Sequence, residues 1–135
     1  MVIKRIVIGE DDKEDVDLFK EVLADLAFEA ELNVALNGIE LMEMLEEGEL
    51  FPELVFLDLN MPLKNGMLCL KEIRANELLK RIKVVILSTS SHQDQIKAAY
   101  DQGADFYVTK SVNYTDFKNA IAACLHKNWQ LSESI

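Results

Sequence analysis

The stretch Leu54-Val55-Phe56-Leu57-Asp58-Leu59-Asn60-Met61-Pro62 decides the fold. Its first four residues are bulky and apolar without interruption, which is typical of a strand buried on both faces, as in a parallel sheet. Asp58 follows this run directly. A carboxylate beside buried apolar residues costs free energy unless it is paired or coordinated. The stretch therefore predicts a buried strand of a parallel sheet that ends in a functional aspartate.

The same pattern of a short apolar run and a longer amphipathic stretch repeats along the chain. Further strands are predicted at residues 3–8, 32–36, 84–87 and 106–108, of which 32–36 is the weakest. Helical periodicity marks residues 16–26, 39–45, 68–79, 96–100 and 117–125. Strands joined by single helices predict an α/β fold, a flavodoxin-like (βα)5 three-layer sandwich around a five-stranded parallel sheet. We expect one domain over residues 1–127 and a short C-terminal extension at residues 128–135.

Composition restricts the function. The 135 residues carry a net charge of −10, and 17 acidic side chains against 5 basic ones fall within residues 1–67. So acidic a chain is a poor binder of nucleic acid or of an anionic membrane surface. Its longest apolar run, residues 120–125, is far too short to insert into a membrane. Cys69 and Cys124 form no metal-binding pair and suggest buried thiols in a reducing compartment, so we expect a cytoplasmic protein. At this length we expect no output domain beside the main one.

Polar side chains gather where the predicted strands end, the edge at which such sheets bind ligands. They are Glu10, Asp11 and Asp12 after the first strand, Asp58 after the third, Ser88 after the fourth and Lys110 after the fifth. Clustered carboxylates repel one another unless a cation neutralises them, and an all-oxygen set suits Mg²⁺. A magnesium ion, a lysine and a hydroxyl suit a phosphoryl group, with one carboxylate left as nucleophile.

Each of these residues also has an ordinary structural explanation. The acidic run at residues 10–12 is compatible with a helix cap and a solvated helix start, and Asp12 with Asp15 fits that role. Ser88 could end its strand by bonding local backbone, and Lys110 could be a surface residue. The coincidence of all of them at four strand ends favours a shared site.

The chain resembles the receiver domain of two-component response regulators over residues 2–127. Four segments carry the resemblance: Ile6-Val7-Ile8-Gly9-Glu10-Asp11-Asp12, Asp58-Leu59-Asn60-Met61-Pro62-Leu63-Lys64-Asn65-Gly66, Leu87-Ser88-Thr89, and Gly103-Ala104-Asp105-Phe106-Tyr107-Val108-Thr109-Lys110. The Asp-x-x-Met-Pro-x-x-x-Gly segment is highly specific when the acidic pair, hydroxyl and lysine stand in the same order. The chain looks like a stand-alone, chemotaxis-regulator-like receiver. Its Glu-Asp-Asp start and Thr-Lys-Ser ending resemble the subgroup that partners phytochrome-type sensor kinases.

The resemblance implies a role for each site residue. Asp58 matches the phosphoacceptor. Glu10 and Asp11 match the acidic pair that holds Mg²⁺ together with Asp58 and the backbone carbonyl of Asn60. Lys110 matches the lysine that pairs with the phosphoryl group.

Two further positions match the family's switch. Ser88 matches the hydroxyl that meets a phosphoryl oxygen, with Thr89 left as the next residue. Tyr107 matches the aromatic ring whose orientation reports phosphorylation, although it could also simply pack at the sheet edge. Ser90, two residues after Ser88, and Asn60, two after Asp58, are expected to flank the path of the attacking water and to tune the lifetime of the phosphoryl group.

One residue departs from the family pattern. Ser111 follows Lys110 where the family usually has proline with a cis peptide bond. A cis bond without proline costs about 3–4 kcal/mol, so both a trans loop and a strained cis bond are open at this point.

The expected function is that of a single-domain response regulator in a phosphorelay. A sensor histidine kinase or a histidine phosphotransfer protein would phosphorylate Asp58, and the chain would catalyse only its own phosphorylation and autodephosphorylation. A downstream protein, or a second copy, would bind the face of the fourth helix, fifth strand and fifth helix, with Ile96, Lys97, Tyr100, Tyr107 and Phe117. The alternative is a degenerate, unphosphorylated receiver that acts as an adaptor. An aspartyl-phosphate hydrolase is disfavoured because Asn60 stands where such enzymes have a second aspartate.

Overall fold

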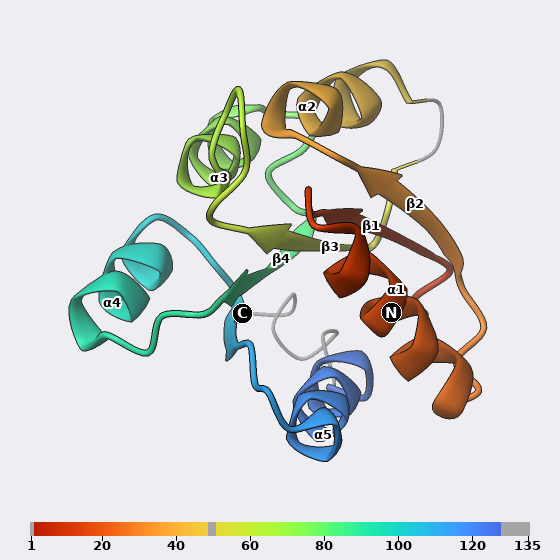
Figure 1. Cartoon of the computed structure of the whole chain (residues 1–135). Helices are drawn as coiled ribbons and strands as arrows, with labels where there is room; N and C mark the ends of the chain where they lie inside the picture. Colours follow the sequence, from red (N-terminus) through yellow and green to blue (C-terminus); the bar gives the residue numbers. More distant parts are fainter. Residues whose placement is uncertain (1, 49–50, 128–135) are drawn as a thin grey trace.

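A sheet of five parallel strands forms the centre of the molecule (Figure 1). The computed structural model describes residues 2–48 and 51–127. The elements are β1 (Arg5–Gly9), α1 (Lys13–Asp25), β2 (Glu31–Ala35), α2 (Gly38–Glu47), β3 (Leu54–Asp58), α3 (Gly66–Ala75), β4 (Lys83–Ser88), α4 (Gln93–Asp101), β5 (Phe106–Thr109) and α5 (Tyr114–Leu125). The strand order is β2-β1-β3-β4-β5. The predicted flavodoxin-like (βα)5 sandwich is confirmed.

Helices cover both faces of the sheet. Phe19 of α1 and Ile121 of α5 pack with Phe56 in one core cluster. Leu41 of α2, Leu70 of α3 and Ala99 of α4 pack with Val55 in the other. Successive residues of a strand point to opposite faces, so the uninterrupted apolar run in β3 supplies both cores, and all five of its residues are buried.

The order of the strands determines where a ligand can bind to the sheet. The chain passes from β1 outward to β2 and then returns to place β3 on the other side of β1. The helices that follow β1 and β3 therefore lie on opposite faces, α1 on one and α3 on the other. Loops that diverge in this way leave room for a ligand between the carboxyl ends of the two strands.

The helix predicted over residues 68–79 ends four residues early, so that part of the prediction was wrong. Asn76 leaves the helical conformation, with ψ of 120°. Its side-chain oxygen accepts a hydrogen bond from the Leu78 N–H at 2.8 Å, and its carbonyl accepts from the Leu79 N–H at 3.0 Å. Asparagine competes with the helix by bonding nearby backbone in this way. Leu79 is buried in the turn, so its position in the apolar stripe reflects the core and not a helix face.

The edge strand, the cysteines and the C-terminal residues were also subjects of prediction. The weak strand at 32–36 is β2, an edge strand whose half-exposed residues explain the weak pattern. Cys69 and Cys124 are buried, and neither forms a disulfide. In residues 2–48 and 51–127, no helix has the length and apolar character needed to cross a membrane. The predicted extension at 128–135 lies outside the described residues.

Candidate functional site

Asp58 ends β3 in the middle of the sheet. It pairs with Leu87 of β4, while the preceding residue pairs with Gly9 of β1. Its side chain is only 7% exposed, and its Oδ1 accepts a hydrogen bond from the Asn60 N–H at 3.0 Å. The loop after β3 closes tightly over this position, because the Gly66 N–H donates to the Leu59 carbonyl at 3.1 Å. The sheet thus presents one buried, oriented carboxylate at its carboxyl edge.

Glu10 and Asp11 follow β1 at the same edge. Glu10 is fully buried, and its N–H donates to the Ala35 carbonyl at 2.9 Å, whereas Asp11 is exposed. Asp12 is the N-cap of α1, because its Oδ1 accepts from the Glu14 N–H at 2.8 Å. The residues after the first strand therefore place two carboxylates at this edge and a third at the helix start, and the predicted capping role of Asp12 is confirmed.

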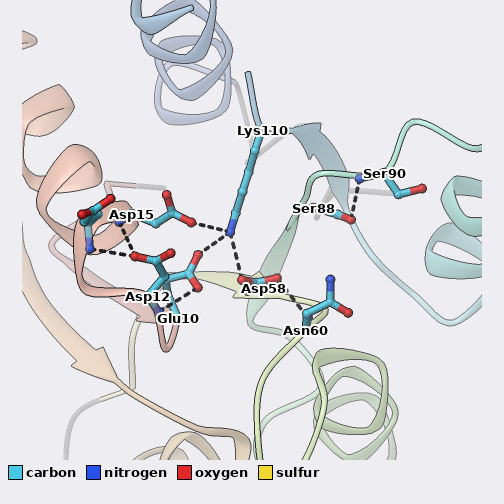
Figure 2. A network of polar contacts seen from close by, with 9 residues as sticks. Glu10, Asp12, Asp15, Asp58, Asn60, Ser88, Ser90 and Lys110 are labelled. Carbon is cyan, nitrogen blue, oxygen red and sulfur yellow. Dashed lines mark hydrogen bonds and ion pairs between the residues drawn. The ribbon is translucent and has the colours of Figure 1, made fainter. Parts of the chain in front are cut away.

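Lys110 binds three carboxylates with one ammonium group (Figure 2). Its Nζ lies 2.5 Å from Glu10 Oε1, 2.9 Å from Asp58 Oδ2 and 3.0 Å from Asp15 Oδ2. The Lys110 N–H donates to the Ser88 carbonyl at 2.7 Å, which holds the loop after β5 against β4. The peptide bond between Lys110 and Ser111 is trans. An ammonium has three donors, and here each one has a carboxylate within reach.

Burial and crowding change the protonation of this cluster. Burial, and then the hydrogen bond and negative charge of Asp58, raise the pKa of Glu10 to about 8 against the opposing effect of Lys110. Burial lowers the pKa of Lys110, but hydrogen bonds to Glu10, Asp58 and Asp15 raise it by more, so it lies above its ordinary value. Lysine is therefore charged, and the carboxylates around it carry a surplus of negative charge that favours binding of a proton or a metal cation.

This surplus predicts a pH-dependent stability. The pKa of Glu10 is higher in the folded chain, about 8, than its ordinary value of 4.5, so the folded chain binds this proton more tightly than the unfolded chain does. The resulting stabilisation is fully present below pH 4.5 and is lost as the pH rises through about 8. Without divalent cations, we expect the free energy of unfolding of the wild type to fall over this range relative to that of Glu10→Gln. Urea denaturation at a series of pH values measures the difference. Saturating Mg²⁺ should remove most of it, and parallel pH profiles without the cation would contradict the prediction.

The acidic residues of two strand ends form a group that could hold a metal ion. Carboxylate oxygens of Glu10, Asp11 and Asp58 all lie within 4.8 Å of one another. Oxygen donors suit hard divalent cations, and Mg²⁺ binds oxygen at about 2.1 Å with several waters retained. These three residues fit such an ion. Asn60 lies beside Asp58 through its N–H, and its carbonyl as a ligand stays a prediction.

Ser88 and Tyr107 are connected through the loop that follows β4. Ser88 is fully buried, and its Oγ accepts a hydrogen bond from the Ser90 N–H at 3.1 Å. Tyr107 in β5 is buried, and its hydroxyl donates to the Ser90 carbonyl at 2.8 Å. Figure 2 shows Ser88 on the side of Asp58 away from Asp15. Thr89 is exposed. The hydroxyl beside the site and the aromatic ring therefore contact the same short segment.

The proposed partner face is only partly a surface. Lys97 and Tyr100 of α4 are exposed, and Ile96 is half-buried. Tyr107 and Phe117 are buried at 9% and 5% exposure, and Phe117 packs in the core between α1, α5 and the sheet. The expectation that Phe117 lies on this face was therefore wrong, because the apolar stripe of α5 points into the core.

Asp15 has a second role that the sequence did not predict. Its position fits a helix start, but its carboxylate also contacts Lys110, 95 positions away. One signal in the sequence was available: Asp15 stands in the first turn of a helix that begins at the carboxyl ends of the strands, close to the predicted site. Pairing across 95 positions depends on how α1 packs against the loop after β5, and no local pattern shows that.

Comparison with known proteins points to one family. The response regulator receiver domain profile matches residues 6–122. Response regulator Rcp1 of Synechocystis sp. is 40% identical over 118 residues, which span 84% of this chain and 80% of that protein. The Mn²⁺-bound crystal structure of Rcp1 has a TM-score of 0.80 at 38% identity and covers 87% of this chain and 88% of its own. The phosphorylated cyanobacterial phytochrome response regulator RcpA has a TM-score of 0.84 at 35% identity, covering 98% and 96%. The chain belongs to the response regulator receiver domain family and is similar to stand-alone phytochrome response regulators.

Proposed function

We propose that this receiver domain accepts a phosphoryl group on Asp58 from a sensor histidine kinase or a histidine phosphotransfer protein. The observation that carries the proposal is the position of Asp58, which belongs to the metal-compatible acidic group and also contacts the Lys110 ammonium at 2.9 Å. Phosphorylated RcpA supports the same chemistry for this chain. Proteins of the phytochrome response regulator type among the similar structures support a phytochrome-type kinase as the donor.

The transfer requires one oxygen of Asp58 to attack phosphorus. The new bond joins that Oδ to phosphorus, while the bond between phosphorus and the imidazole nitrogen of phosphohistidine breaks and the imidazole leaves. Lys110, 2.9 Å from Oδ2, would then donate to a phosphoryl oxygen, and the Asn60 N–H orients the carboxylate through Oδ1. Mg²⁺, held by Glu10, Asp11, Asp58 and the Asn60 carbonyl, would supply charge neutralisation for the phosphoryl oxygens. The chain would catalyse only this step and the hydrolysis of its own acyl phosphate.

Ser88 and Tyr107 supply the response to phosphorylation. In the proposal, the Ser88 hydroxyl turns to a phosphoryl oxygen and gives up its bond from the Ser90 N–H. The segment that accepts the Tyr107 hydroxyl bond then shifts, and the ring changes position. A shift of this kind depends on contacts that differ between the two states. The face of α4, β5 and α5 would thereby alter its affinity for a downstream protein or a second copy, with no nucleic acid involved. We place the protein in the cytoplasm, where its buried thiols would stay reduced.

Incubation with acetyl phosphate tests the proposal without a known kinase. With Mg²⁺ present, we expect the intact mass to increase by one phosphoryl group and peptide mapping to locate it on Asp58. Addition of EDTA in excess of Mg²⁺ should prevent the gain, since the acidic group would lose its cation. An unchanged mass in the presence of Mg²⁺, with no response to beryllofluoride, would contradict the proposal and favour an unphosphorylated adaptor.

A further inference from the structure

Of the three carboxylates at Lys110, only Asp15 lies outside the metal-compatible group. Glu10 and Asp58 belong to that group and also contact the ammonium. Each of them would have to serve both the lysine and a divalent cation. Asp15 contacts the same ammonium from α1, at 3.0 Å, and is not a member of the group that could bind the cation.

We propose that Asp15 is a positioning residue that holds the Lys110 ammonium over Asp58. This inference rests on the proposed function, because the value of a fixed ammonium lies in meeting a phosphoryl group. A bound cation would compete with Lys110 for the oxygens of Glu10 and Asp58, and formation of an acyl phosphate would remove the negative charge of Asp58. Asp15 keeps one of the three N–H donors and directs the other two toward the site.

The local structure makes Asp15 a fixed anchor. It stands in the first turn of α1, and Asp12, the N-cap, accepts hydrogen bonds from the N–H groups of Glu14 and Asp15. Figure 2 shows Asp15 and Asp58 approaching the ammonium from different elements. A lysine side chain has a flexible four-carbon stem, so two anchors restrict it far more than one. Lys110 is 16% exposed and Asp15 39%, which puts Asp15 on the solvent side of the contact.

Removal of the Asp15 charge should release the ammonium. In Asp15→Asn we expect phosphorylation by acetyl phosphate at saturating Mg²⁺ to slow by about tenfold, as for other residues that orient a group in contact with the reacting atoms. We also expect the ¹H–¹⁵N signal of the Lys110 ammonium, protected from exchange in the unphosphorylated wild type, to broaden or vanish. Asp15→Glu keeps the charge and should restore much of both.

Glu14→Gln is the matched control. Glu14 stands in the same first turn, is exposed, and within the described part of the chain forms no ion pair. It removes the same charge from the start of α1, so any effect through the helix dipole is equal in the two variants. We expect it to leave both the rate and the Lys110 signal unchanged. Equal effects of Glu14→Gln and Asp15→Asn would overturn the proposal.

The two measurements also separate this inference from the proposed function. The ammonium signal is recorded without phosphorylation, so a wild type that accepts no phosphoryl group would contradict the function and leave the positioning test intact. A Lys110 signal that is absent in the wild type, or insensitive to Asp15→Asn, would overturn the positioning role alone. Asp15 should act only through the lysine, so Asp15→Asn should not slow phosphorylation further in a Lys110→Met background. A slowing that persists there would also overturn the positioning role.

Discussion

Asp58→Asn should abolish phosphorylation by acetyl phosphate. The variant keeps the shape of the side chain but loses the anionic oxygen that attacks phosphorus. Loss of a nucleophile typically costs several orders of magnitude in rate, so we expect at least about 100-fold slower labelling. Intact mass spectrometry against time measures it.

Asp17→Asn is the control for this substitution. Asp17 is an exposed carboxylate on α1, and its loss changes the net charge by the same amount. It should label at the wild-type rate. Asp58→Asn should remain folded without a cation, because it removes a negative charge that raises the pKa of Glu10. Undiminished labelling of a folded Asp58→Asn protein would rule out Asp58 as the acceptor.

The second large effect is expected at Gly66, the first residue of α3. A Cβ built there would lie 2.3 Å from the carbonyl oxygen of Asp58 and 2.8 Å from the Cα of Leu59. Both are backbone atoms at the end of a central strand, so no flexible side chain can yield. We expect Gly66→Ala to destabilise the fold by about 3 kcal/mol, and to lower the melting temperature by about 10 °C. Thermal and urea denaturation measure the change.

Gly9→Ala offers a comparison in the same sheet. A Cβ at Gly9 would lie 3.1 Å from the Sδ of Met61, the end of a flexible side chain that can move. We expect a loss below about 1 kcal/mol. A Gly66→Ala variant as mild as Gly9→Ala would contradict the close contact between Gly66 and the backbone of Asp58 and Leu59.

Local patterns were sufficient for the fold and for the strand ends at which the candidate site lies. The uninterrupted apolar run before Asp58 predicted a strand buried on both faces, and β3 has that burial. The end of α3 was predicted four residues too far along, because Leu79 continues the apolar stripe while Asn76 turns the backbone. A residue buried in a turn and one buried on a helix look alike in sequence when their spacing matches.

The partners within the site required the tertiary structure. The sequence indicated that Glu10, Asp58 and Lys110 share one edge of the sheet, since the carboxyl ends of parallel strands meet there. It did not indicate that Asp15 binds the same ammonium or that Phe117 is buried.

Sequence by itself therefore determined the parallel α/β architecture, the acidic strand ends and the family. Only the packing of α1 and α5 on one face decided which carboxylates surround Lys110 and which aromatic rings are buried. The physical reason is the separation along the sequence between the residues that interact. Strand and helix patterns arise from neighbouring residues, whereas an ion pair across 95 positions depends on how separate elements dock.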